Sequence, residues 1–300
     1  MKIAANTRLL TALTGVLFAT GLIHSSNAQA DSAPSMSDVA TDASLASTVP
    51  KFYRDRGELV AGANPDIAPI KFIDEDGKIS GFTPELLSAA AKVLGLNVRL
   101  TQASFDALVP GLSAGRFDVL LSLADFKSRH SAVTFVDYLN MGETVVATPS
   151  SKVALRSLEE MCGLQVAVPK GSGTIPEGGR ISEKCVQEGK PAVTMATYPD
   201  SNMALLSVTT GASQVAWVDS PTGYYNAQKF PAKYKVIYFT YKAPYGIGFG
   251  PDEKGKQLAT AMQKALLKLQ KDGVYDALLK KWALSPKDAK PQFPINGAQL

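Results

Sequence analysis

The sequence has very few of the side chains on which most enzymes and metal sites depend. Among 300 residues there are two histidines, His24 and His130, and two cysteines. A zinc site of the usual kind needs three or four histidine or cysteine ligands, and a Ser-His-Asp hydrolase needs a histidine base. Because His24 lies in a segment that we expect to be removed, His130 would have to serve alone. We therefore expect neither a metal, nor an organic cofactor, nor a catalytic triad.

Charge is also sparse and nearly balanced. Charged residues make up 19% of the chain, with 31 Lys and Arg against 27 Asp and Glu, which gives a formal net charge of +4. A nucleic-acid-binding surface needs a concentrated basic stripe, so we expect no nucleic-acid partner. With 45% hydrophobic residues, the chain is globular and long enough for two compact lobes.

The longest apolar run stands near the N-terminus. Lys2 and Arg8 precede an apolar run over residues 9–23, and Ala28-Gln29-Ala30 follows it with small residues. This pattern is typical of a secretory signal peptide over residues 1–30, cleaved after Ala30, whereas a permanent membrane anchor needs about 20 apolar residues. We expect an exported protein.

Export makes the two cysteines, Cys162 and Cys185, interpretable. In an oxidising compartment an even pair favours a disulfide. A reactive thiol would need a base, and only His130 is present to serve as one. We expect a structural disulfide between Cys162 and Cys185.

Strand-like and helix-like segments alternate between residues 51 and 284. Helical periodicity begins at Thr83, the predicted N-cap of the first long helix, and Gly95 ends that helix. Short apolar runs predict strands at 59–62, 97–100, 118–121, 165–168 and 214–218, with further helices at 105–114, 180–188, 201–210, 258–269 and 274–284. This alternation indicates an α/β fold with mostly parallel sheets. Residues 31–50 and 285–300, rich in small and polar residues or in proline, are predicted to be flexible tails.

Three motifs could carry chemistry. Gly111-Leu-Ser113-Ala-Gly115 matches the nucleophile elbow of hydrolases, but that motif requires a strand before the serine and a helix after it, and here the order is reversed. The segment 170–174 (Lys-Gly-Ser-Gly-Thr) follows a strand, so its backbone N–H groups could cradle an anion; it could equally be a plain flexible loop. Phe105, at the start of a helix, could be a core residue or an aromatic that covers a ligand.

Arg129 and Asp219 stand just beyond the carboxyl ends of two predicted strands. Either could be an ordinary surface charge, but the crevice outside such strand ends is where α/β folds bind ligands. An arginine fork suits a carboxylate and an aspartate suits an ammonium group. Together the two residues predict a zwitterionic ligand.

Several short motifs are weak singly but specific in this order: 81–86 (GFTPEL), 105–112 (FDALVPGL), 115–119 (GRFDV), Arg129 before 135–138 (FVDY), 157–160 (SLEE), 218–221 (VDSP), 244–247 (PYGI) and 269–276 (LQKDGVYD). On these motifs, the chain over about residues 55–284 resembles the bacterial family 3 extracellular solute-binding proteins, the amino-acid-binding components of ABC importers. The resemblance implies a type II periplasmic-binding-protein fold. Lobe 1 would then span 51–145 plus 240–284 and lobe 2 would span 146–239, with hinge crossovers near 143–149 and 237–243.

The resemblance also implies roles for individual residues. Arg129 falls where the family grips the ligand α-carboxylate, Asp219 where it holds the α-ammonium, and Ser122 at a strand-end contact. Ser172, Gly173 and Thr174 fall on the lobe-2 turn that binds the carboxylate, and Phe105 on the aromatic that covers the ligand side chain. The chain departs from the family pattern at Asn64, at Ile67 and at Phe126, which stands where a Thr or Ser usually precedes the arginine by three residues. Asn64, Ile67 and Asp125, which lies beside Phe126, are therefore candidate ligand contacts that would alter the side-chain pocket.

We therefore predict a periplasmic, non-enzymatic receptor that captures an amino acid or a related carboxylate, acts as a monomer and docks on a membrane permease. The alternative is a periplasmic cyclohexadienyl dehydratase on the same fold, for which Asp125 or Glu177 would have to act as general acid. A periplasmic sensory accessory would differ only in its partner.

Overall fold

The computed structural model describes residues 38–284 and 286–298. They fall within one compact unit, residues 33–300. The predicted signal peptide and its cleavage position lie outside the described residues. Among the described residues no helix combines the length and the apolar character that a membrane crossing requires.

Two β-sheets organise the chain. The larger has the strand order β5-β1-β6-β11-β7-β10-β8-β9 and the smaller the order β2-β3-β4. The strands are β1 (Glu58–Ala63), β2 (Asp66–Ile67), β3 (Lys71–Ile73), β4 (Ile79–Ser80), β5 (Asn97–Gln102), β6 (Val119–Ala124), β7 (Thr134–Ala147), β8 (Gln165–Pro169), β9 (Thr194–Tyr198), β10 (Val215–Asp219) and β11 (Lys235–Phe249).

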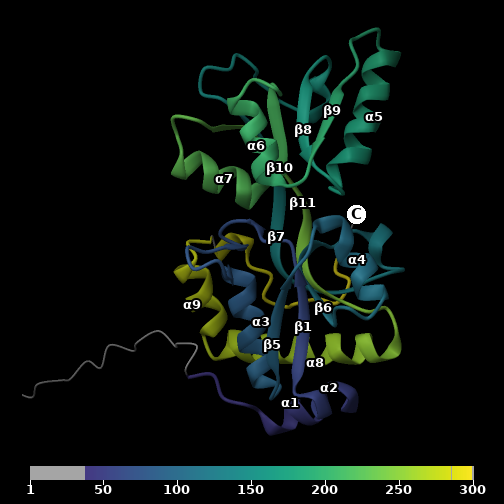
Figure 1. Ribbon diagram of the computed structural model, residues 1–300, viewed down its shortest axis with the longest axis vertical. Helices are drawn as coiled ribbons and strands as arrows, with labels where there is room; N and C mark the ends of the chain where they lie inside the picture. The colour runs from purple at the N-terminus through teal and green to yellow at the C-terminus, as the bar shows by residue number, and fades with distance from the viewer. Residues whose placement is uncertain (1–37, 285, 299–300) are drawn as a thin grey trace, which may run out of the picture. The chain divides into compact units, whose positions relative to one another are not determined.

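Helices flank the larger sheet (Figure 1). The α-helices are α1 (Ala43–Ser47), α2 (Lys51–Arg56), α3 (Phe82–Val93), α4 (Phe105–Ser113), α5 (Thr174–Gln187), α6 (Ser201–Thr209), α7 (Ser220–Lys229), α8 (Glu253–Lys271) and α9 (Val274–Lys281). Three short 3-10 turns are η1 (Lys127–Arg129), η2 (Leu158–Met161) and η3 (Pro286–Asp288). Ser113 ends α4 and β6 follows, which is the reverse of a nucleophile elbow.

The long strands β7 and β11 belong to both halves of the sheet. They pair antiparallel from Thr134 opposite Phe249 to Ala147 opposite Lys235. One half of this ribbon carries the parallel strands β5-β1-β6 and the other carries β10-β8-β9, as Figure 1 shows. We call the first half, with α1–α4, α8 and α9, lobe 1, and the second, with α5–α7, lobe 2. This is the predicted two-lobed α/β architecture, with β7 and β11 as the two connections.

Each lobe has its own hydrophobic core. In lobe 1 the apolar stripe of α3, which includes Leu86, Ala90 and Val93, packs with α8 and α9 against the sheet. In lobe 2, Trp217 lies with Val166 and Ile181 on one face of the sheet, and Leu205 lies with Val218 on the other. The inner parallel strands β6, β8 and β10 are mostly buried and have continuous apolar runs, as expected for parallel strands covered on both faces, whereas the outer strands β5 and β9 are partly exposed.

Thr83 is not the N-cap of α3, which corrects the sequence prediction. The helix begins at Phe82 with Gly81 as N-cap, so the N-cap lies two residues before the predicted one. A side chain at Gly81 would lie 2.6 Å from the carbonyl oxygen of Ile70, and its φ is +128°, so glycine is required there. Thr83 is instead buried, and its hydroxyl bonds with those of Tyr138 (2.8 Å) and Ser122 (3.0 Å).

The predicted N-terminal tail is structured over its described part. Residues 38–50 include α1 and bury Val39 and Val49 against lobe 1. The backbone N–H of Asp42 donates to the carbonyl of Val93 at 2.9 Å, so the segment is hydrogen-bonded to the end of α3. The mainly small and polar composition of this segment gave no indication that Val39 and Val49 would be buried.

The predicted C-terminal tail is also structured, as an extended strap over residues 286–298. Isolated bridges join Ile295 to Val136 and Ala289 to Leu139 on β7. Phe293 is fully buried against Tyr275, with ring centroids 5.2 Å apart. Burying a phenylalanine stabilises the folded state by about 1.5–3 kcal/mol, which explains why a proline-rich segment follows the sheet edge.

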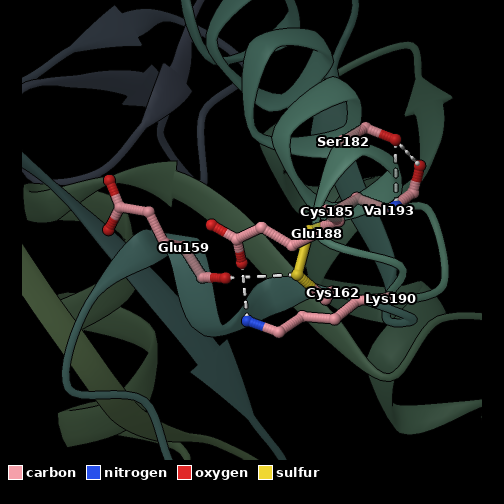
Figure 2. The surroundings of a disulfide bond; sticks show 7 residues. All are labelled: Glu159, Cys162, Ser182, Cys185, Glu188, Lys190 and Val193. Carbon is pink, nitrogen blue, oxygen red and sulfur yellow. Dashed lines mark hydrogen bonds and ion pairs between the residues drawn. A yellow bond between two sulfur atoms is a disulfide. The ribbon is translucent and has the colours of Figure 1, made fainter.

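A disulfide joins Cys162 to Cys185, as predicted, with Cα atoms 5.6 Å apart. It fastens the residue after η2 to the last turn of α5, and the Ser182 hydroxyl holds the same helix to Val193 through two hydrogen bonds (Figure 2). The disulfide therefore anchors α5, whose first residue is Thr174.

The first prediction concerns this disulfide. Replacing both cysteines, Cys162→Ala with Cys185→Ala, should lower the free energy of unfolding by about 3 kcal/mol, because the bond closes a loop in the unfolded chain. Urea unfolding of the variant, compared with the native protein with and without reductant, measures the change. Equal midpoints for all three samples would contradict the role in stability.

The second prediction concerns Asp137, buried beneath the strap. Burial and the neighbouring Asp125 carboxylate raise the pKa of Asp137 to about 8, against the opposing charge of Lys290, whose Nζ is 4.0 Å away. His130, which contacts Asp125, is a further titratable group close to this carboxyl pair. Between pH 4 and pH 8 the unfolded chain releases the Asp137 proton while the folded chain keeps it, so this residue makes stability fall as pH rises.

Asp137→Asn should remove that contribution, so the variant should gain stability relative to the native protein at pH 8 and gain less at pH 5. Urea midpoints at both pH values test this, with the exposed Asp55→Asn as control. Parallel pH profiles for the native protein and Asp137→Asn would contradict the prediction.

Candidate functional site

A small cavity lies where the strands of both lobes end, beside β7 and β11. It encloses about 40 Å³, which is room for only a few water molecules. Residues just beyond the carboxyl ends of β1, β6, β8 and β10 contribute to it, as expected for a ligand crevice in an α/β sheet. Its lining consists of Asn64, Asp66, Ile67, Phe105, Ser122, Ala124, Phe126, Arg129, Met141, Glu143, Pro169, Ser172, Gly173, Pro199, Ser201, Asp219 and Tyr245.

The structure brings together most of the residues that the sequence nominated. Thr174 is buried directly behind the lining, where its hydroxyl bonds with that of Ser172 at 2.8 Å. Asp125 is not brought to the cavity. The residues that line it, as nominated, are Asn64, Ile67, Phe105, Ser122, Arg129, Ser172, Gly173 and Asp219.

Asp125 instead forms a hydrogen bond with the strap, which corrects the prediction that it contacts the ligand. It is fully buried, with one carboxylate oxygen 2.5 Å from His130 Nε2 and the other accepting from the backbone N–H of Ala298 at 3.1 Å. Asp125 is absent from the cavity lining, although it directly follows Ala124, which lines the cavity. Its place next to Phe126 in the sequence could not reveal this.

Arg129 is held in place by its own turn. It ends η1, and its Nη1 donates to the carbonyl of Ala124 at 2.9 Å. The guanidinium lies close to two aromatic rings, with its Cζ 5.7 Å from the Phe105 centroid and 5.0 Å from the Phe126 centroid. Burial lowers the pKa of Arg129, and Asp219 and Asp125 oppose that effect. The result is an oriented cation, well suited to a planar carboxylate.

Asp219 ends β10 and faces the cavity from lobe 2. Tyr245, on the lobe-1 half of β11, donates its hydroxyl to Asp219 Oδ2 at 2.5 Å. Burial raises the pKa of Asp219, while the Tyr245 hydrogen bond and the charges of Lys71 and Arg129 lower it. Asp219 and Arg129 thus place opposite charges on one small cavity.

The predicted anion-binding loop leads into a helix. Gly173 is the N-cap of α5, a 14-residue helix, and Ser172 precedes it. Both residues line the cavity, so the positive end of the α5 dipole and its first N–H groups face the same space as Arg129. Gly171 provides the left-handed turn before them, with φ +79°.

The loop after β1 is built around a buried lysine. Lys71 Nζ donates to both oxygens of Asn64, to the backbone carbonyl at 2.8 Å and to the side-chain Oδ1 at 2.5 Å. Burial lowers the pKa of Lys71 to about 8, although Asp66 and Asp219 oppose this. Asn64 Nδ2 in turn donates to Asp66 at 2.5 Å, so Asn64 links Lys71 to the cavity.

Sequence reasoning missed several lining residues, chiefly Asp66, Glu143 and Ser201. Glu143 lies on β7, a strand that the apolar pattern did not indicate because its run also contains Asp137 and Asn140. Ser201 lies at the start of α6, where a helix N-terminus was predicted without a role. The one sequence signal for a further acidic residue at the site is that Asp66 lies two positions after Asn64, which was itself a predicted site residue.

Contacts between the lobes close the cavity. Lys170 Nζ of lobe 2 lies 2.7 Å from Asp106 Oδ2 of lobe 1, and the backbone N–H of Ser201 donates to Asp66 Oδ2 at 3.2 Å. A side chain at Gly173 would lie 2.8 Å from Phe126, so the lobes approach closely there. The described arrangement is therefore a closed one.

A larger groove, about 600 Å³, lies across β7 and β11 from the cavity and is rich in aromatic rings, including Tyr224, Phe239 and Trp282. Asn140 of β7 lines the groove, whereas Glu143 lines the cavity. None of the nominated site residues lines the groove. Although the cavity is smaller than the groove, we take it as the candidate site because Arg129 of lobe 1 and Asp219 of lobe 2 both line it.

Comparison with known proteins identifies the family of the chain. Residues 59–285 match the model of the bacterial extracellular solute-binding proteins, family 3, and the chain belongs to that family. It is 30% identical to the arginine-binding protein ArgT of Corynebacterium glutamicum over 79% of this chain and 77% of that protein.

Two solved structures share the fold. An ancestral arginine-binding protein bound to arginine superposes with a TM-score of 0.68 at 27% identity, covering 76% of this chain and 98% of that one. An ancestral amino-acid-binding protein, described as a precursor of cyclohexadienyl dehydratase, superposes with a TM-score of 0.64 at 27% identity, covering 77% of this chain and 97% of that one. These likenesses bear out the predicted type II periplasmic-binding-protein fold.

Proposed function

We propose that this protein is a periplasmic receptor that captures an amino acid or a related zwitterionic carboxylate for an ABC importer. The observation that supports this most directly is the convergence of Arg129 from lobe 1 and Asp219 from lobe 2 on one cavity. A ligand that carries both charges would bridge the lobes. The membership in the family and the names of its relatives point to the same class of ligand.

The ligand carboxylate would bind between Arg129 and the start of α5. The guanidinium fork can donate two parallel hydrogen bonds to a carboxylate. The N–H groups around Gly173 and the Ser172 hydroxyl supply further donors, with the helix dipole in the favourable direction. Phe105 and Phe126 exclude water from the pair and so strengthen it.

The ligand ammonium would bind to Asp219. The Tyr245 hydroxyl already bonds to one carboxylate oxygen of Asp219 and fixes the orientation of that group. An ammonium ion compensates the desolvation that raises the Asp219 pKa, so ligand binding should keep Asp219 ionised.

Ligand entry requires the lobes to move apart. A cavity of about 40 Å³ cannot admit an amino acid while the contacts between Lys170 and Asp106 and between Ser201 and Asp66 persist. The middle of β7 and β11, where pairing passes from one lobe to the other, is the place for a hinge. We expect the monomeric, closed form to be the one that docks on a membrane permease.

The dehydratase alternative has a structural relative in its favour. Its two candidate acids do not support it, because neither Asp125 nor Glu177 lines the cavity. A substrate in the cavity would therefore not contact either carboxyl group. We retain the receptor as the proposed function and include dehydratase substrates in its test.

The third prediction is the direct test of this proposal. Thermal denaturation of the purified protein with each of the twenty amino acids, prephenate and arogenate should show a stabilising ligand among the amino acids. At about 100 times the dissociation constant the gain is about 2.7 kcal/mol, a shift of roughly 5–10 °C for a chain of this size. No shift with any amino acid, together with turnover of prephenate or arogenate, would contradict the receptor function.

The fourth prediction assigns the carboxylate partner. Arg129→Ala should weaken the binding of that ligand by at least about thirtyfold, because it leaves a desolvated carboxylate without its charged partner. Arg156→Ala, at an exposed position in lobe 2, should leave the affinity unchanged. Calorimetric titration of both variants checks the assignment, and equal affinities would contradict it.

The fifth prediction tests closure. Gly173→Ala places a Cβ 2.8 Å from Phe126, which hinders the approach of the lobes, whereas a Cβ at Gly179 of the same helix meets nothing within 4 Å. We expect Gly173→Ala to bind the ligand more weakly with little loss of thermal stability in its absence, and Gly179→Ala to bind as the native protein does. If both variants bind alike, closure at this contact is not needed.

A further inference from the structure

A fully buried lysine stands beside the cavity, on the smaller sheet. Lys71 is the first residue of β3 and is 0% exposed. A lysine is rarely buried to this extent unless it has specific partners. Its Nζ donates to the backbone carbonyl of Asn64 at 2.8 Å and to the side-chain Oδ1 of the same residue at 2.5 Å. Lys71 therefore holds the loop that joins β1 to β2.

The Lys71 ammonium group also decides which end of the Asn64 amide faces Asp66. An amide has an oxygen that accepts and an NH2 group that donates, whereas a lysine can only donate. Because Lys71 donates to Oδ1 of Asn64, the NH2 end is turned to Asp66, whose Oδ1 accepts from Asn64 Nδ2 at 2.5 Å. The backbone N–H of Asp66 also donates to the carbonyl of Asn64 at 3.1 Å. Asp66 is thus held by both its side chain and its backbone.

The other carboxylate oxygen of Asp66 bonds to lobe 2. Asp66 Oδ2 accepts from the backbone N–H of Ser201 at 3.2 Å. Ser201 is the first residue of α6, and the N–H groups in the first turn of a helix have no partner within that helix. A carboxylate at this position also faces the positive end of the helix dipole. Within lobe 2, Asp200 caps the N–H of Met203 at 2.8 Å, so α6 receives one cap from each lobe.

We propose that Asp66 caps α6 across the lobe boundary in the closed form, and that Lys71 is a positioning residue that directs Asp66 through Asn64. We call the contact between Asp66 and the Ser201 N–H the interlobe cap. The proposal rests on the proposed function in taking the closed form as the one that holds the ligand. Asn64, Asp66 and Ser201 all line the cavity. The interlobe cap must break when the lobes separate to admit a ligand, so its strength contributes to the balance between open and closed forms.

Amide hydrogen exchange of the Ser201 N–H, followed by NMR, reports on the interlobe cap directly. The protein is measured alone and with a mixture of the twenty amino acids. Asp66→Ala removes the acceptor and should accelerate exchange at Ser201 by at least about tenfold, since a hydrogen bond to a charged group is worth roughly ten- to hundredfold in an equilibrium constant. Exchange at Met203 of the same helix is the internal reference and should not change, because its acceptor, Asp200, belongs to lobe 2.

Lys71→Met tests the positioning role, because methionine is also long and unbranched but cannot donate a hydrogen bond. We expect it to accelerate exchange at Ser201 by at least about threefold, although Asp66 is still present. Asp76→Ala and Lys78→Met, at exposed positions between β3 and β4, are the matched controls and should leave exchange at Ser201 unchanged. Circular dichroism verifies that each variant is folded.

Asn64→Ala interrupts the same connection at its middle and should act as Lys71→Met does, so the test does not depend on the folding of one variant. If both variants leave the Ser201 N–H as protected as in the native protein, the positioning role of Lys71 is wrong.

Two results would overturn the interlobe cap itself. One is an unprotected Ser201 N–H in the native protein, both alone and with the amino acids. The other is equal acceleration at Ser201 and Met203 in Asp66→Ala, because the variant would then loosen α6 as a whole. A failure of the receptor function is seen separately, as the absence of a thermal shift with any amino acid, and exchange in the protein alone still decides whether the interlobe cap forms.

Discussion

The pairing of β7 with β11 along their whole length is the constraint on which the rest of the structure depends. Because the two strands share one ribbon, each lobe completes its sheet on the same pair of chains. The carboxyl ends of the parallel strands in both lobes therefore meet beside the middle of the ribbon. The cavity forms there as a consequence of topology, and the side chains at those strand ends supply its chemistry.

The same ribbon explains how the lobes can move without losing their cores. The hydrophobic clusters of lobe 1 and lobe 2 contain different residues, so a bend in β7 and β11 leaves each core packed. The contacts that close the cavity, such as Lys170 with Asp106, are polar and few. Exposed ion pairs contribute at most about 1 kcal/mol, so a ligand that bonds to both lobes can decide the balance between open and closed forms.

The sequence predicts the local part of this arrangement well and the long-range part poorly. Arg129 and Asp219 follow short apolar strands, and local patterns suffice to place both at strand ends. β7 was missed because polar residues interrupt its apolar pattern, and each has a tertiary reason: Asp137 lies under the strap and Glu143 faces the cavity. The strap itself was missed because its burial depends on Phe293 and on contacts with residues more than a hundred positions away.

The opposite charges on the two lobes make closure depend on what the cavity holds. Arg129 belongs to lobe 1 and Asp219 to lobe 2, and both residues line the cavity. Closing the lobes removes water from both charged groups, which costs free energy unless a partner of opposite charge replaces the water. A ligand that carries a carboxylate and an ammonium group supplies both partners at once, so such a ligand shifts the equilibrium from the open to the closed state.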